Sequence, residues 1–356
     1  MSSSRDWKWL WLFAVLLGSL VARAEEKRTV TKIADGVYAI EHATGAHMMR
    51  SGNTTVVIGE RQVLVVDTCF EQSAAREDIA QIRQWTDKPV AFVLNTHFHN
   101  DHNLGNRAYM TAFPAVTIVA HTETKKSMDM YGPGSLRREL KSIESLQKML
   151  ETGKDSAGTA LTDEDRTLVK SIIAARQPAI DELKQVQFQS ATLTFDSDLT
   201  IDLGNREVQI KYLGKGNTAG DAIAYLPKEK ILVAGDLVAY PTPNTFDGYP
   251  SEWVDTMDRL AALDADTIVP GHGPVMHDKK YLLLVRDLLK SARDQVNATL
   301  SAIGPPMFSG FDGVKSAVDL SAFRERFAGN DKNQGERFDA VAAALVKLLF
   351  EEAGLR

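Results

Sequence analysis

Short apolar runs rich in β-branched residues, separated by glycine-containing turns, dominate residues 36–120. Such runs are typical of β-strands. They predict strands at 36–41, 54–59, 62–68, 89–94 and 116–120. One intervening stretch predicts a helix, from Ser73 as a candidate N-cap to Trp85. This part of the chain is therefore expected to be rich in strands.

The pattern changes to a helical one between residues 122 and 190. Apolar residues recur there at three- and four-residue spacing behind Ser135, at Leu136, Leu140, Ile143, Leu146 and Leu150. The segment 162–165 resembles a capping box at the start of a second helix, which Pro178 should kink or end. We therefore expect a helical insertion of residues 122–190.

Strand-like patterns return after the insertion. They predict strands at 192–195, 199–203, 207–213, 222–226, 230–234 and 267–269, with a helix at 253–263. Two apolar stripes at helical spacing follow, from Tyr281 and from Phe338, with a loop at 304–306 between them. The expected organisation is one domain over residues 25–277 and a helical extension over residues 278–356.

The first 24 residues have the pattern of a secretory signal peptide. Arg5 and Lys8 precede an apolar run at 9–22, and the small-x-small motif of Ala22 and Ala24 marks a cleavage site after Ala24. The run is shorter than the roughly 20 residues that span a bilayer, so the alternative, a membrane anchor, is disfavoured. We expect a periplasmic or secreted protein with no stable membrane span after cleavage.

Charge and cysteine content exclude several classes. The chain of 356 residues has 41 basic and 47 acidic side chains, a formal charge of −6, and no long basic run, so a nucleic-acid partner is not expected. Its one cysteine, Cys69, excludes an internal disulfide and a cysteine-cluster zinc module. This thiol is expected to be a small buried core group. An exported chain without disulfides favours a bacterial periplasm.

Four potential metal ligands crowd into one short segment. His97, His99, Asp101 and His102 follow directly after the predicted strand at 89–94. Imidazole and carboxylate groups suit zinc and similar divalent ions. One tetrahedral ion could hardly collect four ligands from so tight a loop, so the spacing favours two ions.

Two further segments present ligands at strand ends. The predicted strand at 230–234 ends in Gly235 and Asp236, and the strand at 267–269 leads to His272 between two glycines. Sites in α/β sheets lie at strand ends, and the glycines leave the imidazole open. Together with the first segment, these residues predict one metal centre.

These motifs resemble the metallo-β-lactamase superfamily, over about residues 33–275. The resemblance implies an α/β fold, a four-layer αββα sandwich with metals at one edge between two sheets. It further implies the roles of seven residues: His97 and His99 as ligands of site 1, Asp101, His102 and His272 as ligands of site 2, Asp236 as a bridging carboxylate, and Asp67 behind the ligands.

One position departs from the family pattern. Asn217 stands where most members carry the third histidine of site 1. A neutral amide oxygen is a poor zinc ligand beside imidazole. We therefore expect one or two zinc ions, with site 2 the tighter site and Asn217 at most a weak ligand.

The implied activity is hydrolysis of a small molecule. A divalent cation lowers the pKa of bound water from ~16 to about 7, which supplies hydroxide at neutral pH. The expected reaction opens an ester, lactone, thioester or amide, with Asp101 orienting the nucleophile or moving a proton. Met48 and Met49 could form an apolar flap over the substrate, or simply pack in the core.

Other functions stay open at this stage. One alternative is a β-lactamase, although Ala239 stands where one branch has a substrate-binding lysine. Another is a non-catalytic metal- or ligand-binding protein in which site 1 is degenerate, because Asn217 replaces its histidine. A third is a scaffold, in which loss of residues 278–356 abolishes partner binding and leaves metal content unchanged. The oligomeric state is not predicted.

Overall fold

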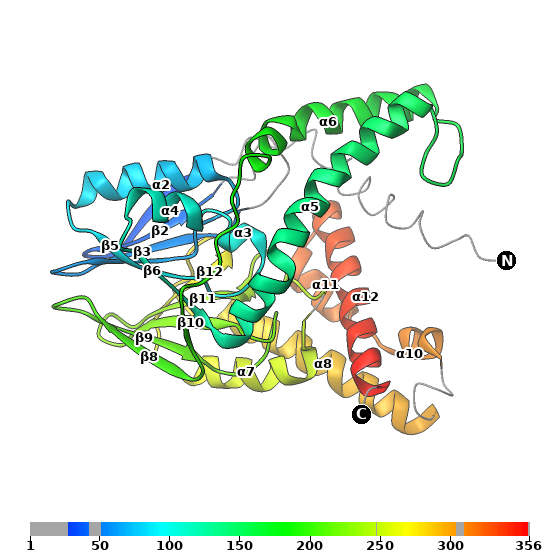
Figure 1. Cartoon of the computed structure of the whole chain (residues 1–356). Helices are drawn as coiled ribbons and strands as arrows, with labels where there is room; N and C mark the ends of the chain where they lie inside the picture. Colours follow the sequence, from blue (N-terminus) through cyan, green and yellow to red (C-terminus); the bar gives the residue numbers. More distant parts are fainter. Residues whose placement is uncertain (1–27, 43–50, 247, 304–309, 355–356) are drawn as a thin grey trace.

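A computed structural model describes residues 28–42, 51–246, 248–303 and 310–354 (Figure 1). The predicted signal peptide and the predicted flap residues Met48 and Met49 lie outside the described residues. Within the described part, no helix is both long enough and apolar enough to cross a membrane.

The strands form two sheets. The first has seven strands in chain order: β1 (Thr29–Ala34), β2 (Val37–Glu41), β3 (Thr54–Ile58), β4 (Val63–Val66), β5 (Val90–Leu94), β6 (Thr117–His121) and β7 (Leu193–Phe195). The second has five, in the order β12 (Thr267–His272), β11 (Ile231–Ala239), β10 (Ala222–Leu226), β9 (Glu207–Tyr212) and β8 (Asp198–Asp202). The strand predictions are confirmed, except that β1 was not anticipated and several ends differ.

The two sheets face each other and bury an apolar layer. Leu64 and Leu94 of the first sheet belong to the same buried cluster as Ile210 and Val233 of the second. Helices cover both outer faces (Figure 1): α2 (Gln72–Trp85) and α4 (Asn106–Ala112) on the first sheet, α7 (Pro250–Ala262) and α8 (Lys280–Ile303) on the second. The expected four-layer αββα sandwich is confirmed.

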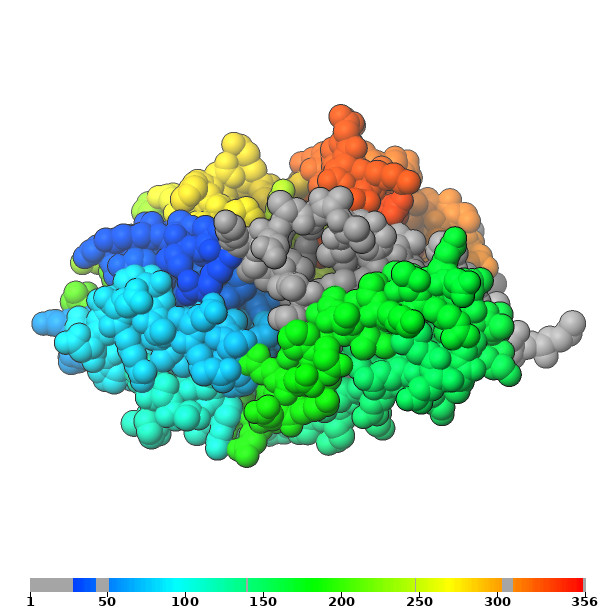
Figure 2. Space-filling model, turned by 90° about the horizontal axis from the view of Figure 1, so that it is seen from above, coloured from blue at the N-terminus to red at the C-terminus, as the bar shows by residue number. Residues whose placement is uncertain are grey.

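The insertion forms a helical hairpin of α5 (Thr122–Thr152) and α6 (Asp163–Leu183), which Figure 2 shows in green at the molecular surface. The capping box at Thr162 is confirmed. One helix start differs from the prediction: helix α5 begins well before Ser135, because the His121 side chain caps it by accepting from the Glu123 N–H. Of the two outcomes predicted for Pro178, a helix end is excluded, since α6 continues to Leu183. Ile180 and Leu183 beyond the proline are buried in a cluster with Ile143 of α5.

Another helix start also differs from the prediction. Glu71, not Ser73, is the N-cap residue of α2. The hydroxyl of Ser73 instead donates to Glu182 Oε2 of the insertion at 2.7 Å. The side chain that was expected to cap the helix therefore takes part in a tertiary contact with Glu182, which local sequence patterns cannot predict.

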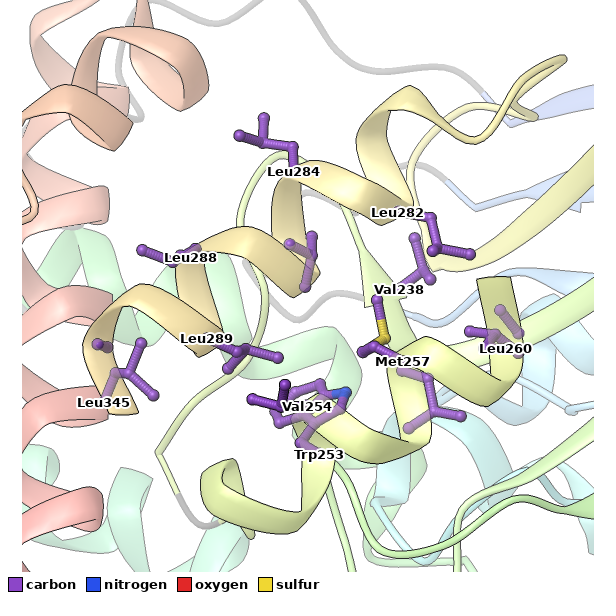
Figure 3. Close-up of a cluster of buried hydrophobic side chains, with 14 of the residues drawn as sticks. Val238, Trp253, Val254, Met257, Leu260, Leu282, Leu284, Leu288, Leu289 and Leu345 are labelled. Atoms are coloured by element: carbon purple, nitrogen blue, oxygen red, sulfur yellow. The ribbon is translucent and has the colours of Figure 1, made fainter. Parts of the chain in front are cut away.

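The C-terminal residues extend the outer helical layer. Helices α8, α10 (Phe311–Ala317), α11 (Ser321–Ala328) and α12 (Lys332–Gly354) follow one another. Leu282 and Leu289 of α8 and Leu345 of α12 lie in one buried cluster with Trp253 and Met257 of α7 (Figure 3). The extension thus shares a core with the second sheet and its covering helix.

Candidate metal centre

The His-x-His-x-Asp-His segment leaves the end of β5. His97 and His99 lie in the connection, and Asp101 and His102 lie in the short helix α3 (Asn100–Asn103). The sequence predicted a loop throughout, because one helical turn leaves no periodicity to detect. His97 and His102 are fully buried.

Asp236 lies inside β11, which is a correction to the predicted strand end. The strand runs on to Ala239, and its pairing with β12 shifts register around Gly235. Gly235 has a φ of +54°, which favours glycine. This irregularity typically re-aims a side chain. A Cβ on Gly271 of β12 would overlap the Asp236 carboxylate, so glycine at that position makes room for it.

The six predicted ligands converge in two groups of three, each with ligand atoms within 4.8 Å of one another: His97, His99 and Asp236, and Asp101, His102 and His272. In the first, His97 Nε2 lies 3.0 Å from His99 Nδ1. In the second, His272 Nε2 lies 3.1 Å from Asp101 Oδ2 and 3.2 Å from His102 Nε2. The structure therefore brings together residues from three separate segments.

Asp236 faces both groups with one carboxylate. Its Oδ1 lies 3.4 Å from His102 Nε2 and 3.5 Å from His272 Nε2. Its Oδ2 lies 3.9 Å from His97 Nε2. This is the position that a bridging ligand between two ions requires.

Asp67 and Thr96 support the ligands from behind. Asp67 Oδ2 lies 2.8 Å from His102 Nδ1, and the same carboxylate accepts from the N–H and hydroxyl of Thr96 at 2.8 and 2.7 Å. Thr96 Oγ1 is also 3.0 Å from His97 Nδ1. Such partners fix the orientation of metal-binding imidazoles. Asp67 was predicted from the sequence and Thr96 was not, because the one sequence signal for Thr96 is its place directly before His97.

We expect the Asp67→Asn variant to bind zinc about 10- to 100-fold more weakly, since loss of such a partner has effects of that size. Asparagine tolerates the left-handed backbone at this position, where φ is +60°, so the fold should persist. Competition with a chelating dye measures the Kd. Asp35→Asn, at a fully exposed side chain, is the control. An unchanged Kd in Asp67→Asn would contradict the assigned role.

The segment before β3 holds the ligand strands together, which the sequence analysis did not foresee. The Gly52 N–H donates to the Asp101 carbonyl at 2.8 Å, and a Cβ on Gly52 would overlap the His102 ring. The Asn53 side chain donates to the carbonyls of Pro270 and Gly273 at 2.9 and 2.7 Å. These bonds join the α3 segment to the His272 segment.

Asn217 lies in the connection between β9 (Glu207–Tyr212) and β10 (Ala222–Leu226). The Ala222 N–H at the start of β10 donates to the Thr96 carbonyl at 2.8 Å. Asn217 is fully buried, and neither of its side-chain amide atoms has a hydrogen-bond partner among the described residues. An unsatisfied buried polar group costs about 1–3 kcal/mol, which a group bound beside Asn217 would offset.

The electrostatics favour a bound cation. Burial opposes ionisation of Asp101 and Asp236, yet the imidazoles of His102 and His272 hold the pKa of both carboxyls below its usual value. Burial disfavours charged His102, yet neighbouring carboxylates, that of Asp101 first, raise its pKa well above normal. Burial lowers the pKa of His97, which keeps it in the neutral form that binds metal. The imidazole and carboxylate ligands of the two groups, together with the unpaired Oδ1 atom of Asp236, thus fit divalent ions such as zinc.

Comparison with known proteins gives a family match. Residues 48–272 match the family model described as "Metallo-beta-lactamase superfamily". A linear primary-alkylsulfatase from Pseudomonas sp. (strain ATCC 19151) is 29% identical over 245 residues, 66% of this chain and 43% of that protein. A type 2 metallo-β-lactamase from Bacillus sp. (strain 170) is 36% identical over 244 residues, 67% of this chain and 72% of that protein. The chain thus spans less than half the length of the alkylsulfatase.

Solved structures share the fold. A metallo-β-lactamase from Pontibacter korlensis gives a TM-score of 0.53 at 21% identity, over 74% of this chain and 99% of that one. The metallo-β-lactamase FIM-1 from Pseudomonas aeruginosa, solved in a mono-zinc form, gives a TM-score of 0.53 at 17% sequence identity. The match covers 76% of this chain and 98% of that one. At these identities the likeness concerns the fold alone.

Proposed function

Because the chain belongs to the metallo-β-lactamase superfamily, and is a metallohydrolase on that ground, we propose that it hydrolyses an ester, lactone, thioester or amide bond in a small molecule. The observation that carries the proposal is the convergence of six imidazole and carboxylate side chains in two adjoining groups. When bound, zinc would acidify a water molecule and polarise the scissile carbonyl.

Within this centre the residues take different parts. His97, His99 and Asp236 would hold one ion, and Asp236 would share a second ion with the Asp101 group. The Asp101 side chain is 28% exposed, whereas those of Asp236 and His102 are 2% and 0% exposed. A carboxylate that substrate and water can reach is able to orient the water and carry a proton to the leaving group. We therefore propose that Asp101, held ionised by its imidazole neighbours, orients the nucleophilic water or moves its proton.

A β-lactamase is the second candidate, favoured by the 36% identity to the Bacillus enzyme. One observation ranks it below the ester-type hydrolase. Ala239, where one lactamase branch has a lysine, is buried, and its carbonyl accepts from the Tyr281 hydroxyl at 2.8 Å. No cation is presented there to a substrate carboxylate. The similarity to an alkylsulfatase adds sulfate esters to the substrates worth testing.

We propose the same cellular setting and organisation as the sequence indicated. Residues 1–24 act as a cleaved signal peptide and deliver the protein to the periplasm or the medium. Residues 25–277 form the catalytic domain, and residues 278–356 form an extension. The apolar run followed by a small-residue cleavage motif supports export.

The decisive experiment measures metal content on protein purified without chelator, with hydrolysis of a p-nitrophenyl ester, a lactone, a primary alkyl sulfate and nitrocefin. At this metal centre we expect about one tightly held zinc ion, in the Asp101 group, and turnover of the ester or lactone. A chelator should abolish turnover and added zinc should restore it. The mass of the same protein shows whether residues 1–24 were removed.

Other outcomes have definite meanings. Two tightly held zinc ions at the metal centre itself, counted apart from any ion bound elsewhere in the chain, would together with turnover reverse the ranking of its two sites. Fast turnover of nitrocefin alone would favour the β-lactamase. An absence of bound metal, together with no activity after zinc or manganese is added back, would overturn the hydrolase proposal.

A further inference from the structure

A second cluster of potential metal ligands lies outside the centre described above. His42, Cys69 and Asp78 offer a ring nitrogen, a sulfur and a carboxylate oxygen that all lie within 4.8 Å of one another. His42 directly follows β2, Cys69 lies in the turn after β4, and Asp78 is in α2. Cys69 packs with apolar residues of α2 against the outer face of the first sheet. The metal centre, by contrast, lies between the sheets.

The cluster is buried, and part of its bonding capacity is unused. The side chains of His42 and Asp78 are 4% and 0% exposed, and Cys69 is fully buried. Arg28 donates to Asp78 Oδ1 at 2.8 and 3.2 Å. The other oxygen, Oδ2, lies 3.1 Å from His42 Nε2 but accepts no hydrogen bond from any described residue. One carboxylate oxygen is thus left beside the imidazole and the thiol.

A second buried polar group lies near enough to the cluster for the charges of Asp78 and Cys69 to act on it. The hydroxyl of Tyr109, on α4, is buried and has no partner within the described ranges. Burial raises the pKa of this phenol well above its usual value, and the nearby charges of Asp78 and Cys69 raise it further. Leaving such a hydroxyl unpaired costs about 1–3 kcal/mol. A group bound in the cluster would satisfy the unpaired Asp78 oxygen, and Tyr109 is a second unpaired oxygen in the same neighbourhood.

The backbone aims Cys69 into this cluster. Cys69 and Asp67 have φ values of +58° and +60°, a region that residues other than glycine rarely occupy. Asp67 points to His102 of the metal centre, and Cys69 points to the α2 side. One turn therefore supplies a side chain to each of the two clusters.

We propose that His42, Cys69 and Asp78 form a separate structural metal site for zinc or a similar divalent cation. Thiolate, imidazole and carboxylate are the ligands that zinc takes. The burial of all three side chains keeps a substrate away and suits a structural role, with a fourth ligand position left beside these three. Binding would displace the thiol proton to solvent. The thiolate, the carboxylate, the Arg28 guanidinium and the divalent cation then sum to +1, less than the cation alone. Such a site would tie β2 and α2 to the turn that carries Asp67.

Cobalt(II) absorption tests the proposal directly. Cys69 is the one cysteine of the chain, and the six ligands of the metal centre include no sulfur. A near-ultraviolet sulfur-to-cobalt charge-transfer band therefore reports only the proposed site, whereas visible d–d bands report both sites. We expect titration of the metal-free full-length protein with cobalt chloride to produce the charge-transfer band and to saturate it at one cobalt ion per Cys69.

Three variants show which residues produce the charge-transfer band. Cys69→Ser should abolish it, and His42→Gln should raise the cobalt concentration that half-saturates it by about 10-fold or more. Asp236→Asn serves as the matched control, because it should diminish the d–d bands of the metal centre and leave the charge-transfer band. If the Cys69→Ser variant does not fold, the cobalt titrations of the wild type and of His42→Gln still test whether the site exists.

A wild-type protein that shows d–d bands without a charge-transfer band would overturn this inference and leave the hydrolase proposal intact. A band that His42→Gln leaves unchanged would exclude His42 as a ligand and overturn the three-residue site. Loss of hydrolysis with a normal charge-transfer band would affect the hydrolase proposal alone. The two proposals therefore fail separately.

Discussion

The Asp236→Asn variant should lose more than about 100-fold in kcat/KM and a large part of its bound zinc. Loss of an outer partner of a metal ligand alone typically costs 10- to 100-fold, and Asp236 contacts both groups directly. Its two oxygens lie 3.4 to 3.9 Å from His102 and His97. An amide in this place keeps the shape but removes the negative charge that both ions would share.

Steady-state kinetics and metal analysis of the purified variant measure the effect. Asp198→Asn is the matched control, because Asp198 lies in the same sheet with a side chain that is 64% exposed. It should retain wild-type turnover and metal content, since exposed ion pairs contribute little. Wild-type activity and zinc content in Asp236→Asn would show that this carboxylate does not bridge two ions.

The Asn217→His variant should bind a second divalent ion about 10-fold or more tightly than the wild type does. Imidazole is a better ligand for zinc than a neutral amide oxygen. Asn217 is fully buried in the loop that leads into β10, with both amide atoms free of hydrogen bonds to any described residue. The new ring would complete three imidazoles around the His97 group.

Zinc titration of the metal-free protein measures the second binding step, and Asn217→Ala is the control, since it removes the amide without adding a ligand. Turnover that rises in Asn217→His identifies the wild type as a weakened hydrolase. Turnover that falls while zinc binds more tightly identifies Asn217 as part of a specialised site. No turnover in either protein supports the non-catalytic alternative. An unchanged second Kd would mean that position 217 does not reach the ion.

Local pattern predicted most of the strands. β-branched apolar runs mark a strand wherever they fall, because each such residue fits a half-buried pleated surface. The same logic failed at Gly235, where the glycine suggests a strand end although β11 continues to Ala239. A register shift, which depends on the partner strand β12, decided that boundary. Helix α3 was not predicted for a different reason, since four residues are too few to show the helical spacing of apolar positions.

Tertiary contacts overrode local helix signals at two places. Ser73 has the side chain of an N-cap, but its hydroxyl bonds to Glu182 of the insertion. Pro178 should kink or end its helix, and the helix does not end there, since the residues after it are buried in a cluster with α5. In both cases the contact depends on a residue that is distant in the sequence or in another helix, so a pattern of neighbouring residues cannot predict it.

The sequence by itself determined the chemical type of the metal centre, because four of its ligands lie in one short segment after β5 and need no folding to be neighbours. It also determined the departure at Asn217, which is a matter of residue identity. The tertiary structure alone decided which distant groups join them. His102 and His272 are 170 residues apart, and their ring nitrogens come within 3.2 Å because β12 and β5 end at the same edge of the sandwich. The grouping of Cys69 with His42 and Asp78 was likewise decided by packing, since the three residues lie on separate elements that meet only when α2 covers the first sheet.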